Sequence, residues 1–308
     1  MADIPAVAQA WRFPTDQSTW KGYQSLQLRE VKLSPPRKGE VLVRLYAAAL
    51  NYSDGAGKVV AVGEGVTQWK EGDRVHSLFF ETWLDGPILP EHNFQALGAG
   101  TPGCLTQYRV FKAETLLPIP DHLSYEEAAT IPCAALTAWN AFFERKPLSD
   151  KSTVLVLGSG GVSVFGAQFA KAAGARVIAT TSSEAKAQKY RALGVDDVVN
   201  CREHPEWSVK VKELTGGVGV EQVLEVGGEG TIFQSIRSIQ REGLIHIGFQ
   251  LSGVQVGNKA MCERLDAFIS RHTIRPVIDR VFGWTEVIDA FEYQTGGSHF
   301  GKVVVKID

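Results

Sequence analysis

The chain reads Val154-Leu155-Val156-Leu157-Gly158-Ser159-Gly160-Gly161-Val162-Ser163 near its centre. An apolar run that meets closely spaced glycines is typical of a buried strand that turns sharply into a helix. The first glycine of such a turn permits the bend, and the second lets backbone amides approach a pyrophosphate. The helix that follows directs its positive end at the phosphates. The stretch predicts a dinucleotide-binding turn, with ligand contacts from Gly158, Ser159, Gly160, Gly161 and Val162.

Ser163 takes the place of a third glycine in this pattern and is small enough for close packing between helix and strand. Gly166 follows about one helical turn later. The alternative interpretation is a glycine-rich turn that binds no ligand. The apolar strand before the turn and the helix after it favour nucleotide binding.

The central region continues as alternating strands and helices. We expect strands at residues 154–157, 176–180, 197–199, 222–226 and 244–247, and helices that reach residue 171 and cover 185–193 and 231–239. Because the strands are apolar on both faces and helices connect them, they predict an α/β fold with a parallel, doubly wound sheet.

The flanking regions have a different texture. Short alternating runs interrupted by Gly, Pro and Asp extend from Leu26 to about Phe111 and predict a β-rich domain. A serine N-cap at Ser124, with carboxylates after it, predicts a helix that continues to Phe143. Towards the C-terminus we expect a helix over 285–293 and a strand over 303–305.

The end of the second central strand discriminates between cofactors. NAD enzymes carry an acidic residue there, which binds the adenosine ribose hydroxyl. This chain has no acid at that position; Thr181, Ser182 and Ser183 precede a new helix that contains Lys186. Hydroxyls, a helix N-terminus and a lysine suit a ribose 2′-phosphate, so we expect NADPH rather than NADH. In the alternative interpretation, a serine only caps the helix and Lys186 is solvated.

Composition narrows the class of partner. The chain has 308 residues, which is enough for one large or two ordinary domains, and its formal net charge of −2 comes without any block of like charges. That balance argues against nucleic acid or an anionic membrane as a partner, so we expect a small-molecule substrate. The N-terminal residues match no targeting pattern, and the four cysteines are dispersed, so the expected location is the cytoplasm.

With these residues in place, the chain resembles the medium-chain dehydrogenase/reductase superfamily, in the zinc-independent branch near quinone oxidoreductases and fungal zinc-type alcohol dehydrogenase-like proteins. The resemblance covers about residues 10–306. Its landmarks are Ala49-Leu50-Asn51-Tyr52, Asp54 to Gly63, Gly72-Asp73-Arg74-Val75, Leu136-Thr137-Ala138-Trp139, the glycine turn, Arg275 to Phe282, and His299 to Val304.

The resemblance implies a GroES-like catalytic domain formed by residues 1–122 and 259–308, and a Rossmann dinucleotide-binding domain over 123–258. It implies hydride transfer between a nicotinamide and a substrate, and it allows a homodimer. Further cofactor-lining positions implied by the resemblance are Thr137, Cys201, Gly227, Gly248 and Phe249. Helix capping and turn geometry are the alternative roles for such residues.

Two residues are the catalytic candidates. By resemblance, Asn51 would orient the substrate or the nicotinamide ribose. Tyr52 could donate its phenol to a carbonyl or quinone oxygen as negative charge develops there, or it could simply pack at the mouth of the substrate site.

We expect no zinc. The catalytic cysteine, the Gly-His-Glu motif and the four-cysteine lobe of zinc-dependent relatives are all absent from the matching stretches. Cys104 and the isolated His76 and His92 do not have the spacing of a tetrahedral site, so the two histidines are interpreted as surface or structural residues.

The chain departs from the family pattern at two places, between Tyr52 and Asp54 and between Gly248 and Val256, where similar proteins have longer segments. The leading hypothesis is an NADPH-dependent reductase of quinones or α,β-unsaturated carbonyls. The alternatives are an alcohol dehydrogenase, an enoyl-thioester reductase, or an NADPH-binding relative without turnover.

Overall fold

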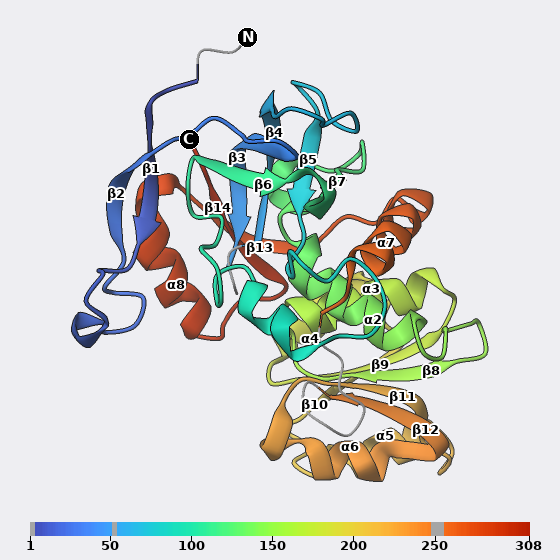
Figure 1. Ribbon diagram of the computed structural model, residues 1–308. Coiled ribbons are helices and arrows are strands. Elements are labelled where there is room, and N and C mark those ends of the chain that lie inside the picture. The colour runs from blue at the N-terminus through green and yellow to red at the C-terminus, as the bar shows by residue number, and fades with distance from the viewer. Residues whose placement is uncertain (1–3, 51–53, 248–255) are drawn as a thin grey trace. The chain divides into compact units, whose positions relative to one another are not determined.

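The computed structural model describes residues 4–50, 54–247 and 256–308 of the chain (Figure 1). The chain divides into two compact units. Unit 1 consists of residues 1–133 and 258–308, and unit 2 consists of residues 134–257. The two places where the chain departs from the family pattern fall on residues 51–53 and 248–255, outside the described residues.

Unit 1 contains a sheet with the strand order β13-β14-β3-β4-β5-β7, in which β6 also pairs with β3. Its neighbouring strands are antiparallel except for the parallel pair of β13 and β14. A separate antiparallel pair joins β1 (Val7–Arg12) to β2 (Gln27–Lys32). The strands of the larger sheet are β3 (Glu40–Ala49), β4 (Asp54–Val62), β5 (Arg74–Ser77), β6 (Tyr108–Lys112), β7 (Leu116–Pro118), β13 (Ile278–Phe282) and β14 (Lys302–Lys306).

The core of unit 1 is built from both ends of the chain. Alternate residues of β3, Val41, Val43 and Leu45, are buried in one cluster with Val287, the first residue of helix α8 (Val287–Thr295), and with Trp284 just before that helix. Alternation along a strand places these side chains on one face of the sheet. The C-terminal segment therefore completes a core that the N-terminal strands begin.

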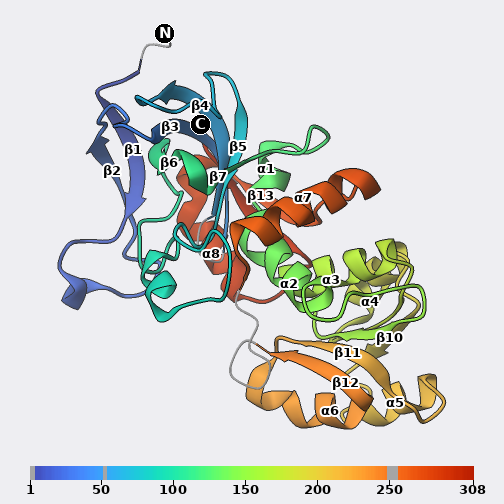
Figure 2. The same ribbon diagram turned by 45° about the vertical axis from the view of Figure 1, so that its right-hand side comes forward.

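Unit 2 is a parallel sheet with the order β10-β9-β8-β11-β12. Helices α2, α3 and α4 lie on one face and α5 and α6 on the other (Figures 1 and 2). The predicted doubly wound sheet is confirmed. The elements are α2 (Leu136–Phe143), β8 (Thr153–Val156), α3 (Gly161–Ala172), β9 (Arg176–Thr181), α4 (Glu184–Ala192), β10 (Asp197–Asn200), α5 (Trp207–Leu214), β11 (Val220–Glu225), α6 (Ile232–Ser238) and β12 (Ile239–Ile247).

The helix expected from Ser124 to Phe143 is interrupted. Ser124 caps α1 (Tyr125–Ala128) in a capping box with Glu127, and a π-helical turn over Ile131–Ala135 separates α1 from α2. Pro132 lies in that turn, where it has no backbone N–H to continue an α-helical ladder. Because α1 packs on β3, β4 and β14, residues 123–133 lie in unit 1, whereas the resemblance implies a dinucleotide-binding domain that begins at residue 123.

Helix α7 (Lys259–His272) was not expected from the sequence. Asn258 caps it by accepting a hydrogen bond from the Met261 amide. Its buried face consists of Cys262, Leu265, Asp266 and Ile269, so a carboxylate interrupts the apolar stripe that would have indicated the helix. In the part of the chain that the structure describes, no helix is both long and apolar enough to span a membrane.

Candidate functional site

The glycine turn has the geometry that its sequence requires. After β8 the backbone of Gly158 adopts a φ of +73°, a conformation that side chains with a Cβ rarely adopt. Gly160 is the N-cap of α3, and no side chain caps the first turn of that helix. The first amides of α3 are therefore presented to a ligand rather than to a capping group.

There is room for a phosphate at this turn. A Cβ added to Gly158 or Gly160 would meet no atom within 4 Å, so the two glycines face open space. The N-terminus of a helix of twelve residues, with open space before it, fits a pyrophosphate group.

Close packing behind the turn explains its two small residues. The Ser163 hydroxyl donates a hydrogen bond of 2.6 Å to the carbonyl of Leu157, and Ser163 is fully buried. At Gly166 a Cβ would lie 2.6 Å from Leu224 Cδ2 and 3.2 Å from Phe142 Cε2. Helix α3 therefore approaches β8 and β11 as closely as we expected from the sequence.

Tyr190 fixes the turn from the far end of α4, and sequence reasoning missed it. Its phenol donates a hydrogen bond of 2.6 Å to the carbonyl of Gly158. The ring is fully buried, and burial raises the pKa of the phenol. A tyrosine on the apolar face of the helix after the second strand was the available signal, but it did not indicate its partner.

The end of β9 presents hydroxyl groups beside the glycine turn. Thr180 Oγ1 accepts a hydrogen bond from the Gly158 amide, at 3.2 Å. Thr181 Oγ1 is buried and has no hydrogen-bond partner among the described residues. Ser183 caps α4 by accepting from the Lys186 amide, and Ser182 and Lys186 are half-buried. The unsatisfied Thr181 hydroxyl is a group that a ligand could use.

Cys201 follows β10 and lies against the same edge. Its amide donates to the Thr181 carbonyl at 2.8 Å, while its half-buried side chain packs on the apolar core of unit 2. Thr137 lies in the first turn of α2, which packs on α3 and β11.

The end of β11 is organised by Glu225, a residue that sequence reasoning did not single out. Its buried carboxylate accepts hydrogen bonds from the amides of Gly227 (2.7 Å) and Gly228 (3.0 Å) and from the hydroxyls of Thr231 (2.6 Å) and Ser235 (2.5 Å). The exposed turn at Gly227 is thereby held in one conformation. The signal that could have found this residue was a carboxylate at the end of an apolar strand.

The sheet order brings these segments together. Each segment lies at the end of one strand, and the four strands are neighbours in one parallel sheet. The glycine turn follows β8, Thr181–Ser183 lies at the end of β9, Cys201 follows β10 and Gly227 lies just after β11. All four therefore lie at its carboxyl edge, and β8 and β11 flank the point where the strand order reverses, which is where doubly wound sheets bind nucleotides. Asn51, Tyr52, Gly248 and Phe249, the remaining predicted site residues, lie outside the described residues.

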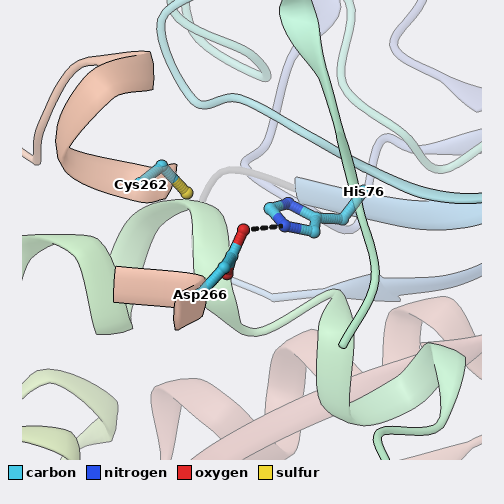
Figure 3. A group of neighbouring side chains, drawn as sticks. All are labelled: His76, Cys262 and Asp266. Carbon is cyan, nitrogen blue, oxygen red and sulfur yellow. Dashed lines mark hydrogen bonds and ion pairs between the residues drawn. The ribbon is translucent and has the colours of Figure 1, made fainter. Parts of the chain in front are cut away.

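A second group of side chains meets inside unit 1. His76 of β5 lies 3.0 Å from Asp266 of α7, and Cys262 lies one helical turn before Asp266 (Figure 3). The three side chains are buried. Sequence spacing could not reveal this group because 190 residues separate His76 from Asp266. His76 is thus structural rather than exposed, and His92 is half-buried beside Thr82 and Trp83.

Two further buried charges lie near this group. Asp54 is fully buried, and burial raises the pKa of its carboxyl to about 7. Lys302 is also buried, its ammonium donates to the carbonyl of Leu50 at 3.0 Å, and burial lowers its pKa. The charge of Lys302 acts on Asp54, and that of Asp54 acts on His76 and Cys262.

Known families match both parts of the chain. Residues 53–121 match the alcohol dehydrogenase GroES-like domain, and residues 161–271 match the zinc-binding dehydrogenase family. A zinc-type alcohol dehydrogenase-like protein of Schizosaccharomyces pombe is 39% identical over 331 residues, which cover 92% of this chain and 96% of that protein.

Two other relatives extend the comparison. A 2-methylene-furan-3-one reductase of Solanum lycopersicum is 29% identical, over 98% of this chain and 80% of its own length. A crystal structure from Sinorhizobium meliloti 1021, provisionally assigned as an alcohol dehydrogenase, is 33% identical with a TM-score of 0.90 and covers 98% of this chain and 99% of its own.

Proposed function

Since the chain belongs to the medium-chain dehydrogenase/reductase superfamily, a family of oxidoreductases, we propose that it is an NADPH-dependent reductase. In this proposal it transfers hydride to a quinone or an α,β-unsaturated carbonyl, and no catalytic zinc takes part.

The observation that carries the choice of cofactor is the end of β9. Thr181, Ser182 and Ser183 lead into α4 there, and no carboxylate stands where an NAD enzyme would bind the ribose hydroxyls. The N-terminus of α4 and Lys186 in its first turn supply positive charge for a 2′-phosphate. The unsatisfied hydroxyl of Thr181 supplies a donor beside them.

NADPH would supply the hydride, and the protein would bind and orient it. The amides at the start of α3 would bind the pyrophosphate, and Tyr190 would keep the Gly158 carbonyl turned away from it. The Glu225 carboxylate would fix the Gly227 turn at the neighbouring strand end. On the substrate side, Tyr52 would donate a hydrogen bond to the acceptor oxygen as charge develops, and Asn51 would orient the substrate or the ribose.

The proposal that the reaction uses no catalytic zinc rests on the sequence. Asn51 or Tyr52 stands where zinc-dependent members carry a cysteine, and no Gly-His-Glu motif precedes Gly57. Polarisation of the acceptor then depends on hydrogen-bond donors.

The substrate class rests on resemblance and on one relative's name. A 2-methylene-furan-3-one is itself an α,β-unsaturated ketone, and the tomato protein that reduces it matches nearly the whole chain. Two other enzyme activities compete with this proposal, oxidation of an alcohol and reduction of an enoyl thioester. A nucleotide-binding protein without turnover is the remaining candidate.

A titration followed by a turnover screen tests the proposal. Fluorescence titration should give a dissociation constant for NADPH at least about tenfold below that for NADH, which one charge-assisted phosphate contact can supply. NADPH oxidation should then be faster with a quinone or an enone than with a saturated aldehyde or an enoyl thioester. Equal affinities would refute the cofactor assignment, and binding without turnover on any acceptor would refute the reductase.

A further inference from the structure

Both ring nitrogens of the buried His76 face hydrogen-bond acceptors. Nδ1 lies 3.0 Å from the carbonyl oxygen of Ser77, and Nε2 lies 3.0 Å from Oδ2 of Asp266 (Figure 3). Because a carbonyl oxygen can only accept, Nδ1 carries a proton. In a neutral imidazole the lone pair of Nε2 then points at a carboxylate oxygen. This contact is favourable only if a proton or a metal ion lies between the two atoms.

One proton leaves other oxygens unsatisfied. Asp266 Oδ1 is buried without a hydrogen-bond partner among the described residues, and the same holds for both carboxylate oxygens of Asp54. Asp54 is 0% exposed and Asp266 is 8% exposed, so bulk water does not replace the missing donors. A protonated His76 would satisfy Oδ2 alone. A cation bound beside Asp266 would balance the charge of this carboxylate, which one hydrogen bond to Oδ2 does only in part.

Cys262 supplies a third donor atom. It lies one turn before Asp266 on α7, so the two side chains project from the same face of the helix. The ligand atoms of His76, Cys262 and Asp266 all lie within 4.8 Å of one another. In a tetrahedral zinc site with nitrogen and sulfur ligands, neighbouring ligand atoms are about 3.5 Å apart. Small rotations of the side chains would bring the three atoms to that separation.

We propose that His76, Cys262 and Asp266 bind a zinc ion that fastens helix α7 to strand β5. Imidazole, thiolate and carboxylate together are donors that suit Zn²⁺ better than Mg²⁺ or Ca²⁺. The hydrogen bond from Nδ1–H to the Ser77 carbonyl is the outer contact that metal-bound histidines usually make. The site takes no part in the proposed hydride transfer and does not depend on it.

An ion can reach the site from a cavity on unit 1. The cavity has a volume of about 750 Å³ and is lined by Asp266, Glu263 and Lys259 of α7 and by residues 116–121. Asp266 thus belongs both to the buried group and to the cavity wall, where Glu263 is a second carboxylate.

Elemental analysis and cobalt substitution test this site on the full-length protein. Purified protein should contain about one zinc per chain, and after removal of zinc it should bind one equivalent of Co²⁺ with a thiolate-to-cobalt charge-transfer band. Protein that contains no zinc and shows no such band on titration with Co²⁺ would overturn the proposal, leaving His76 and Asp266 as a proton-bridged pair.

Variants assign the ligands. Cys262→Ser should abolish the charge-transfer band and weaken Co²⁺ binding at least about tenfold, and Asp266→Asn should weaken binding while the band is retained at saturation. The matched controls are Cys104→Ser, another buried thiol of unit 1, and Glu263→Gln, the neighbouring carboxylate on α7; both should keep the band. A band that survives Cys262→Ser would place the metal elsewhere and overturn the assignment.

A second measurement covers the case in which Cys262→Ser does not fold. The midpoint of thermal unfolding of the unmodified protein should rise with Zn²⁺ concentration and fall again when a chelator is added. An unfolding midpoint that does not respond to either addition would contradict the proposal. NADPH titration of the same samples reports separately on unit 2, so failure of one proposal is distinguishable from failure of the other.

Discussion

The phenol of Tyr190 donates a 2.6 Å hydrogen bond to the carbonyl of Gly158, the first residue of the glycine turn. The Gly158 amide is held in turn by the hydroxyl of Thr180. Two side chains from the second βα unit therefore fix the amide and the carbonyl of Gly158, the residue at which the turn bends.

We predict that Tyr190→Phe weakens both folding and cofactor binding. Loss of one partly buried hydrogen bond should lower the free energy of unfolding by about 1 kcal/mol. The freed carbonyl can turn towards the phosphates, so the dissociation constant of NADPH should rise severalfold. Tyr293→Phe is the control, because it removes a 2.6 Å hydrogen bond to Asp279 in unit 1. Equal losses of NADPH affinity in the two variants would contradict the role of Tyr190.

Lys186→Ala tests the contact with the 2′-phosphate. The variant should bind NADPH about tenfold more weakly than the parent, because one charge-assisted phosphate contact is worth about 1.4 kcal/mol, and it should bind NADH nearly as well as the parent. Lys189→Ala, an exposed position in the last turn of the same helix, is the control. Isothermal titration calorimetry measures the dissociation constants of both cofactors. An equal loss of NADH affinity in the variant would count against a phosphate contact.

We predict that Gly166→Ala destabilises the protein although it replaces glycine within a helix. Alanine would contribute about 1 kcal/mol through helix propensity. Its Cβ would lie 2.6 Å from Leu224 Cδ2, and overpacking of this kind costs about 1–3 kcal/mol, so the net effect should be a loss. Gly230→Ala, where a Cβ would meet nothing within 4 Å, is the control in a urea unfolding experiment. A stabilised Gly166→Ala variant would mean that the packing relaxes easily.

Glu225→Gln should cost about 2–3 kcal/mol of folding free energy. The amide that replaces one carboxylate oxygen would be a donor facing donors from Gly227, Thr231 or Ser235. On the same strand, Glu221→Gln weakens a partly exposed ion pair with Lys146, while the amide oxygen can still accept the hydrogen bond from Ser152, so stability should change by less than about 1 kcal/mol. Urea unfolding of the two variants should therefore separate them clearly.

His246 should make folding sensitive to acid. Burial, and then the charge of Arg145, lower the pKa of this histidine from 6.5 to about 4. Between pH 6.5 and pH 4 the unfolded chain therefore binds a proton at His246, whereas the folded protein does not. The free energy of unfolding falls as the pH is lowered through this range. The difference corresponds to about 3 kcal/mol.

His246→Gln isolates this contribution, since its amide can still donate to Gln222 Oε1, which lies 2.7 Å from the histidine Nε2. The free energy of unfolding should be measured for both proteins between pH 7 and pH 4. The gap between them should narrow by about 3 kcal/mol over that range, in favour of the variant at low pH. Parallel curves would show that His246 does not titrate in this way.

Much of unit 2 could be predicted from local sequence. The apolar run, the glycines and the small Ser163 each restrict backbone geometry within a few residues, and strand and helix periods are local too. These local constraints predict the parallel sheet. They therefore also predict that Thr181–Ser183 and Gly227 lie at its carboxyl edge. Helix α7 escaped prediction because the buried Asp266 breaks its apolar stripe.

By itself the sequence determined the doubly wound sheet and the position of the glycine turn, because strand and helix periods and glycine spacing are local and their alternation can be followed along the chain. Only the tertiary structure decided that Tyr190 holds Gly158, that Glu225 gathers four donors, and that His76 meets Asp266 across 190 residues. Side-chain partners of this kind depend on how strands are ordered and helices are packed, and no local period encodes that order.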